Sequence, residues 1–241
     1  MSQNSRRDFV RGIKDGIPIA LGYLSVSFGF GIMAVSNGLS VFAAVLISMT
    51  NLTSAGQVAG LTVIASGGGM IEMAMAQLII NLRYSLMSLS LSQKLDSRFT
   101  WLSRLGISFG ITDEIFAVAS GKSEDVSKHY MGGLISLPWV GWAAGTLIGG
   151  AAGEIFPEKL KAALGIAIYG MFVAIFVPAA RKALGVLTVV IIAVTGACCL
   201  RYIPLFSGIS DGFAIIICTV LAATLGAIFF PVKQEEGGGG Q

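Results

Sequence analysis

The chain has 241 residues, of which 54% are hydrophobic and only 12% are charged, and its mean hydropathy is +0.81. A soluble domain carries about a quarter of its residues as charged side chains, so an ordinary water-soluble fold is excluded. The net charge of +3 comes from dispersed basic residues that flank apolar spans, so they indicate membrane topology and no nucleic-acid partner is expected.

The first part of the chain predicts insertion into a membrane. Residues 1–15 are polar and are expected to form a cytoplasmic N-terminal segment. From Gly16 to Ile71 there is no Lys, Arg, Asp or Glu. One helix needs about 20 apolar residues to cross the hydrocarbon, so this uncharged run of 56 residues is much longer than one crossing requires. We therefore expect an all-α integral membrane protein with a single polytopic membrane domain over 16–232 and a disordered C-terminal tail over 233–241.

Apolar tracts can be followed along the whole chain between the charges. They cover 17–36, 39–71, 73–93, 102–119, 130–153, 162–180, 183–200 and 212–232. Helices are expected for all of them, because transmembrane strands would show short alternating segments and lipid requires every backbone group to be paired.

The second tract has a polar centre, Thr50-Asn51-Leu52-Thr53-Ser54-Ala55-Gly56-Gln57, at mid-membrane depth. Its flanks, 39–49 and 58–71, are each about half a membrane long at a rise of about 1.5 Å per residue. A broken or re-entrant helix is therefore predicted, with protein or a watery cavity beside the break. Tract 162–180, which contains Gly165, Gly170 and Pro178, is expected to be a second broken element.

The distribution of Lys and Arg favours this topology. With tracts two and six re-entrant, about six full transmembrane helices remain, both termini are cytoplasmic, and 12 positive charges lie inside. Lys122, Lys128 and Arg201 are then expected outside. An offset of 120 residues suggests an inverted repeat of 12–120 and 132–232, because it aligns three pairs: Gly12 with Gly132, Pro18 with Pro138 and Gly29 with Gly149.

Polar residues at the predicted break and on the next helix are candidates for substrate binding. A half-helix N-terminus offers free N–H groups and a positive dipole end to an anion such as an amino-acid carboxylate. The candidates at the break are Asn51, Thr53, Ser54, Ala55, Gly56 and Gln57, and those on one face of tract 73–93 are Gln77, Asn81 and Tyr84. The alternative is that these side chains only satisfy a kink between packed helices.

Arg83 lies about halfway along tract 73–93, where an unpaired cation costs about 2.5–3.5 kcal/mol on insertion scales. Its natural partners are Asp113 and Glu114. Adjacent residues on a helix point in different directions, so one acid is expected to pair with Arg83 while the other faces a cavity. A carboxylate in such a cavity is suited to bind and release a proton, which makes these three residues a candidate charge-coupled switch. A snorkelling arginine and a structural ion pair are the alternatives.

Nothing in the sequence predicts catalysis, a cofactor or a metal site. The cysteines Cys198, Cys199 and Cys218 lie in apolar stretches without the spacing of a zinc site, and His129 is the one histidine. We therefore expect a protein that is not an enzyme. Trp139 and Trp142 are expected to anchor their helix at the membrane interface, and a gate beside Pro138 is the alternative.

Five motifs resemble the AzlC/YgaZ family over about residues 10–230. They are Gly16-Ile17-Pro18-Ile19-Ala20-Leu21-Gly22-Tyr23, Gly29-Phe30-Gly31, Ala55-Gly56-Gln57, Ile80-Asn81-Leu82-Arg83-Tyr84-Ser85-Leu86-Met87 and Thr112-Asp113-Glu114. The resemblance implies the large subunit of a branched-chain amino acid exporter in the cytoplasmic (inner) membrane of a prokaryote. Its substrates would be valine, leucine, isoleucine and, in some members, methionine, its partner a small hydrophobic AzlD/YgaH-like subunit, and its energy source the proton motive force.

One departure from the family pattern bears on the substrate. Where many members have Ala-Gly-Ala-Ala-Gln, this chain has added hydroxyls and an amide at Asn51, Thr53 and Ser54. A different class of function also stays open, namely a passive channel for a small solute or ion, in which a selectivity constriction replaces the coupling carboxylates. Assembly into a higher oligomer in the lipid is left open as well.

Overall fold

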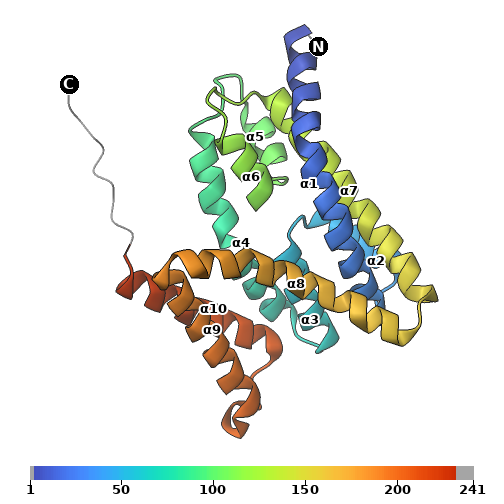
Figure 1. The fold of residues 1–241 in the computed structure, drawn as a ribbon, viewed down its shortest axis with the longest axis vertical. Coiled ribbons are helices and arrows are strands. Elements are labelled where there is room, and N and C mark those ends of the chain that lie inside the picture. Colours follow the sequence, from blue (N-terminus) through green and yellow to red (C-terminus); the bar gives the residue numbers. More distant parts are fainter. Residues whose placement is uncertain (1–2, 232–241) are drawn as a thin grey trace.

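The computed structural model describes residues 3–231, apart from the side chains of residues 3, 158, 161, 162, 164, 165, 167, 168, 171 and 175. The expected all-α fold is confirmed (Figure 1). The helices are α1 (Gln3–Ser36), α2 (Val41–Thr50), α3 (Ser54–Ala65), α4 (Met70–Ser92), α5 (Trp101–Ser108), α6 (Asp113–Ser120), α7 (Lys128–Ile155), α8 (Glu158–Lys182), α9 (Leu184–Tyr202) and α10 (Asp211–Phe229), with a 3₁₀ turn at Pro204–Phe206. The predicted tail, 233–241, lies outside the described residues.

Helices α1 and α7 lie side by side and run in the same direction (Figure 1). Glycines line the seam, and a Cβ at Gly12 would fall on the backbone carbonyl of Tyr130, while one at Gly149 would fall on that of Phe28. Such small residues let two helices approach closely in lipid. The offset near 120 residues is therefore the spacing of residues in contact. An inverted repeat with this offset would run α1 and α7 antiparallel, so their shared direction does not support it. The division of the chain into 12–120 and 132–232 stays a prediction.

The break predicted in the second tract is present. Helix α2 has 10 residues and α3 has 12, and residues 51–53 separate them without helical structure. At about 1.5 Å per residue each helix reaches about half-way across the hydrocarbon. The polar run is shared between the two sides of the break, because Ser54 to Gln57 already form the first turn of α3.

The prediction that tract 162–180 is broken is wrong. Helix α8 continues for 25 residues through Gly165, Gly170 and Pro178. A glycine inside a helix costs only about 1 kcal/mol and does not end it, and Pro178 lies near the C-terminal end, where few hydrogen bonds are lost. In Figure 1, α8 crosses obliquely over the other helices.

The second broken element is instead tract 102–119, which was expected to cross as one helix. It is divided into α5 and α6, each of eight residues, by the segment 109–112. Gly110 packs against Ile135 of α7 so closely that a Cβ would meet that side chain. Thr112 then caps α6, because its hydroxyl accepts a hydrogen bond from the N–H of Ile115 at 3.4 Å. Turn geometry and a capping residue thus interrupt this tract.

This arrangement changes the expected topology. Helix α4, which comes after α1 and before α7 in the chain, runs back toward the N-terminal end of α1 (Figure 1). Lys122, expected on the opposite side of the membrane, forms an ion pair with Asp15 of α1 at 2.7 Å, and Lys128 begins α7 beside it. Among the described residues, α1, α7, α9 and α10 are long and apolar enough to cross a membrane. The count of six crossings stays a prediction.

Candidate functional site

The break between α2 and α3 is built around Gln57, which is 2% exposed. Its side-chain amide donates a hydrogen bond to the backbone carbonyl of Asn51 at 2.5 Å, so a carbonyl freed by the break is satisfied inside the protein. Thr53 caps α3, because its hydroxyl accepts from the N–H of Gly56 at 3.3 Å. The break is therefore a defined structure with buried polar partners.

The second break is held by a tyrosine from α1. The hydroxyl of Tyr23 lies 2.6 Å from a carboxylate oxygen of Glu114 and within hydrogen-bond distance of the Thr112 hydroxyl. Tyr23 is 8% exposed, and its ring meets Trp142 of α7 edge to face, with ring centroids 5.1 Å apart. An aromatic side chain from the α1–α7 seam thus fixes the first turn of α6.

A cavity of about 650 Å³ lies between the two breaks. The first turns of α3 and α6 both open onto it, through Ser54 and Ala55 on one side and Asp113 and Glu114 on the other. Most of its wall is apolar, and the remaining lining residues are Pro18, Ile19, Gly22, Tyr23, Ser25, Val26, Leu52, Arg83, Tyr84, Thr112, Trp142, Phe172 and Phe176. Its size falls in the range of about 300–1,000 Å³ that is typical of small-molecule sites.

Arg83 connects the two breaks along one wall of this cavity. Its guanidinium lies 2.9 Å from the carboxylate of Asp113, and it also donates to the hydroxyl of Tyr84 at 3.1 Å. The Tyr84 hydroxyl in turn donates to Thr53, the cap of α3, at 3.4 Å. The pairing of Arg83 with one acid, expected from the sequence, is present, and Glu114 is the acid left beside Tyr23. Both breaks therefore share one chain of polar contacts.

A second connection between the two breaks runs through Trp142. The indole N–H of Trp142 donates to the side-chain oxygen of Gln57 at 3.2 Å, and the Trp142 ring contacts Tyr23. Trp142 is 3% exposed, so the expectation of an interfacial anchor is wrong for it. The physical reason is that α7 packs along α1 on this face, which turns the indole into the protein. Trp139 donates to the carbonyl of Met49 in α2 at 3.0 Å.

The residues predicted to bind substrate divide into two groups. Ser54, Ala55 and Tyr84 line the large cavity, and Thr53 touches it through Tyr84. The others lie behind the break, where Asn51, Gly56, Gln57 and Gln77 line a smaller cavity of about 240 Å³. This second group carries the hydrogen bonds of the break.

Asn81 and Gln77 of α4 hold the break from behind. Gln77 donates to the carbonyl of Gly56 at 2.8 Å and accepts from Asn81 at 3.1 Å. The side-chain oxygen of Asn81 is buried and, among the described residues, has no hydrogen-bond partner. Amide groups of α4 thus replace the helix hydrogen bonds that the break removes.

From the sequence, Tyr23 and Thr112 were given no role in the site and Trp142 was assigned to the membrane interface, although all three line the cavity. Tyr23 lies in an uncharged span, and a hydroxyl at membrane depth requires a hydrogen-bond partner within the protein. The sequence therefore indicated that Tyr23 contacts another polar group. Thr112 precedes two acids, which is the pattern of a capped helix start inside an apolar tract. Phe172 and Phe176 of α8 reach the cavity by tertiary packing, which no local pattern predicts.

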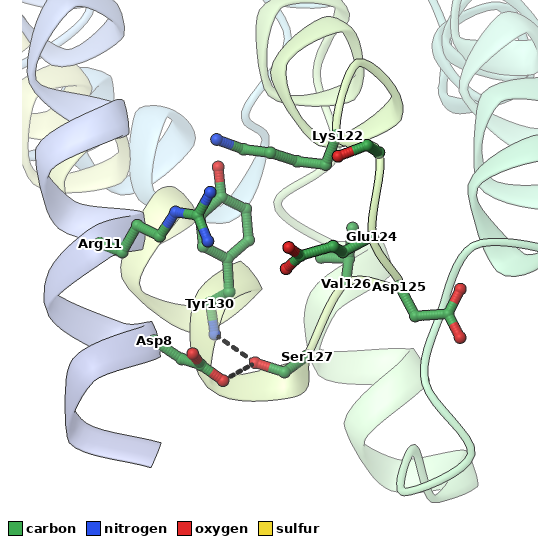
Figure 2. A pocket seen from close by; sticks show the side chains of 9 residues that line it. Asp8, Arg11, Lys122, Glu124, Asp125, Val126, Ser127 and Tyr130 are labelled. Carbon is green, nitrogen blue, oxygen red and sulfur yellow. Dashed lines mark hydrogen bonds between the residues drawn. The ribbon is translucent and has the colours of Figure 1, made fainter. Parts of the chain in front are cut away.

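A separate polar cluster closes the N-terminal end of the bundle (Figure 2). Asp8 accepts from the hydroxyl of Ser127 at 2.7 Å, and that hydroxyl caps α7 by accepting from the N–H of Tyr130 at 3.2 Å. Asp15 accepts from Lys122 and from the Tyr130 hydroxyl, each at 2.7 Å. The small cavity here measures about 130 Å³. These contacts tie α1 to the loop before α7.

Comparison with known proteins places these features in a family. The AzlC protein family model matches residues 18–156, a stretch that contains both breaks. The inner membrane protein YgaZ of Escherichia coli is 28% identical over 234 residues, which is 94% of this chain and 94% of that relative. An uncharacterized membrane protein of Archaeoglobus fulgidus is 30% identical over 172 residues, 70% of this chain and 75% of the relative.

A third membrane protein, from Helicobacter pylori, is 26% identical over 156 residues, 62% of this chain and 68% of the relative. No solved structure matches this chain. The family model covers more than half of the chain, and the relatives are named as membrane proteins in agreement with the long apolar helices. The chain is therefore a multi-pass membrane protein and belongs to the AzlC family.

Proposed function

We propose that this chain exports branched-chain amino acids, namely valine, leucine and isoleucine with methionine, across the cytoplasmic membrane. It would work as the large subunit beside a small hydrophobic AzlD/YgaH-like subunit. The observation that carries the proposal is the cavity onto which two interrupted helices open. Discontinuous helices whose N-termini meet at a cavity in the membrane are the arrangement with which many transporters bind their substrates.

The lining of the cavity supports an aliphatic amino acid as cargo. Ile19, Val26 and Leu52 offer a wall for an aliphatic side chain, while Ser54 and Arg83 offer hydrogen-bond donors to a head group. An apolar pocket separates side chains that differ by one methylene by only about 1–3 kcal/mol. The substrates are therefore expected to overlap.

The acids at the start of α6 support coupling to protons. Asp113 is paired with Arg83, whereas the contact of Glu114 is the neutral hydroxyl of Tyr23. A carboxylate that faces a cavity within a membrane protein is a common element of proton relays. Exchange of a proton for substrate at the start of α6 would couple proton entry into the cell, driven by the proton motive force, to export of the substrate.

The distribution of charge supports a cytoplasmic N-terminus. Basic residues gather at the end where α1 begins. They lie in the first turns of α1 and in the loops around 94–98 and 121–127. These two loops contact each other, and the second one contacts α1. The basic residues are Arg6, Arg7, Arg11, Lys14, Lys94, Arg98, Lys122 and Lys128. The loops at 37–40 and 66–69, toward the other end, contain no charged residue. Positive charge marks the cytoplasmic side of short loops.

Efflux of labelled leucine tests the proposal. Cells that make the chain together with a small AzlD-type subunit should lose preloaded leucine faster than cells with an empty vector. The variant Ala55→Trp, which fills the cavity, should abolish the difference, while Leu86→Trp on the 68%-exposed Leu86 of α4 should preserve it. Efflux equal to that of the empty vector contradicts the proposal. Leucine flux that does not respond to collapse of the proton gradient would instead favour a passive channel.

A further inference from the structure

The two helix N-termini at the large cavity differ in charge. The first turn of α3, Ser54 to Gly56, carries no charged side chain, so its free N–H groups leave this end positive. The first turn of α6 carries Asp113 and Glu114, which outweigh the partial positive charge of the helix end. One side of the cavity therefore favours an anion, and the other favours a cation.

Arg83 strengthens the positive side and is the link between the two. It pairs with Asp113 at 2.9 Å and contacts Tyr84, which reaches the cap of α3. Among the described residues that line the cavity, Arg83 is the one cation, and it stands against the two carboxylates of Asp113 and Glu114. One negative charge is thus left over at the α6 side when both acids are ionised, and the group within hydrogen-bond distance of Glu114 is the neutral Tyr23 hydroxyl.

The Arg83–Asp113 pair is accessible from the cavity. Both residues line it, and their side chains are 46% and 45% exposed. A guanidinium binds a carboxylate with two parallel hydrogen bonds, and two neighbouring carboxylates are a good acceptor set for an ammonium group. A molecule that carries both charges would satisfy each partner again after the pair opens.

We propose that the substrate enters this ion pair as a zwitterion. Its carboxylate binds Arg83 and the N–H groups of Ser54 and Ala55, and its ammonium binds Asp113 and Glu114. This inference rests on the proposed function and deepens it, because it assigns the head group to the pair and makes both charges of the substrate obligatory. The apolar wall then receives the side chain.

Competition in everted membrane vesicles tests the requirement for both charges. The vesicles contain the full chain with its small subunit, and uptake of labelled leucine is measured with unlabelled competitors. Leucine should compete, whereas 3-methylbutylamine, which lacks the carboxylate, and 4-methylpentanoate, which lacks the ammonium, should compete at least about 100-fold less well. Competition by either analogue at the concentration at which leucine competes overturns the inference.

A pair of neutral substitutions separates binding from a structural role. If the ion pair only holds the helices, removing both charges in the double variant Arg83→Gln/Asp113→Asn should restore the transport that each single variant loses. If the pair binds substrate, the double variant should stay about 10- to 100-fold below wild type at the same protein level. Restored transport overturns the inference. The matched control is Arg201→Gln/Asp211→Asn, because that ion pair, with atoms 3.8 Å apart, lies on the surface.

The two failures can be told apart. Wild-type vesicles that take up no more leucine than vesicles without the chain would contradict the proposed function itself. Wild-type vesicles that transport leucine but accept 4-methylpentanoate equally well would contradict only the zwitterion site. The competition experiment uses the wild-type protein, so it remains decisive even if the double variant does not fold.

Discussion

Trp142 donates a hydrogen bond to the side chain of Gln57 across 3.2 Å, and both residues are almost completely buried. This bond joins α7, the partner of α1, to the first turn of the interrupted helix α3. Because Gln57 also satisfies the freed carbonyl of Asn51, one glutamine side chain supports the break from two directions. The geometry of the cavity thus depends on residues that do not all line it.

Replacing Trp142 by Phe should destabilise the protein. The substitution leaves the side-chain oxygen of Gln57 buried without this donor, which costs about 1–3 kcal/mol in the free energy of unfolding. Chemical denaturation of the purified chain in detergent measures the change, and Trp101→Phe is the control because Trp101 is 68% exposed. In a double-mutant cycle with Gln57→Leu, effects that simply add within about 0.5 kcal/mol would show that the bond contributes nothing.

Replacing Tyr23 by Phe should impair transport while the fold is kept. The variant retains the ring contact with Trp142 but removes the hydroxyl beside Glu114. A hydrogen bond to a charged group contributes about 1.5–3 kcal/mol, so kcat/KM for leucine should fall about tenfold or more. Initial uptake rates in everted vesicles measure this. Tyr202→Phe is the control, since Tyr202 is 81% exposed, and an equal effect of both variants would speak against a role for Tyr23.

The seam between α1 and α7 should not tolerate a methyl group at Gly149. A Cβ there would fall on the backbone carbonyl of Phe28, and overpacking of this kind costs about 1–3 kcal/mol. The melting temperature of Gly149→Ala should therefore drop. Gly106→Ala in α5, where a Cβ meets open space, should leave it unchanged or raise it slightly. A Gly149→Ala protein as stable as wild type would mean that the helices are further apart.

Labelling of single cysteines should place the loop before α7 on the cytoplasmic side. In a chain without Cys198, Cys199 and Cys218, a membrane-impermeant maleimide should modify Ser123→Cys in everted vesicles and not in intact cells. Ser66→Cys, in the exposed loop between α3 and α4, should show the reverse. Modification of both positions from the same side of the membrane would contradict this topology, in which α4 crosses the membrane and α5 and α6 together do not.

Much of the fold was predictable because lipid imposes strong rules on a sequence. A polar run such as Asn51 to Gln57 cannot sit in a continuous helix facing hydrocarbon, so the first break followed from composition alone. The charged residue Arg83 in an apolar tract required a partner, and Asp113 is that partner.

The remaining features could not be read from local patterns. Interruption of the tract at 109–112 depends on how Gly110 meets Ile135 of a distant helix, and the continuity of α8 through Pro178 depends on where along the helix the proline falls. The matched glycines 120 residues apart were ambiguous, because direct packing and internal repetition give the same spacing. Tyr23 and Trp142 reach the site only through the packing of α1 on α7.

Protection of a cysteine at the break is the most direct test of the claim that substrate binds between α3 and α6. In the same cysteine-free chain, Ser54→Cys lines the large cavity, while Ser66→Cys lies in a surface loop. The account predicts that saturating leucine slows alkylation of Ser54→Cys by N-ethylmaleimide and leaves Ser66→Cys unaffected. An alkylation rate at Ser54→Cys that leucine does not change, in a variant that still transports leucine, would contradict it.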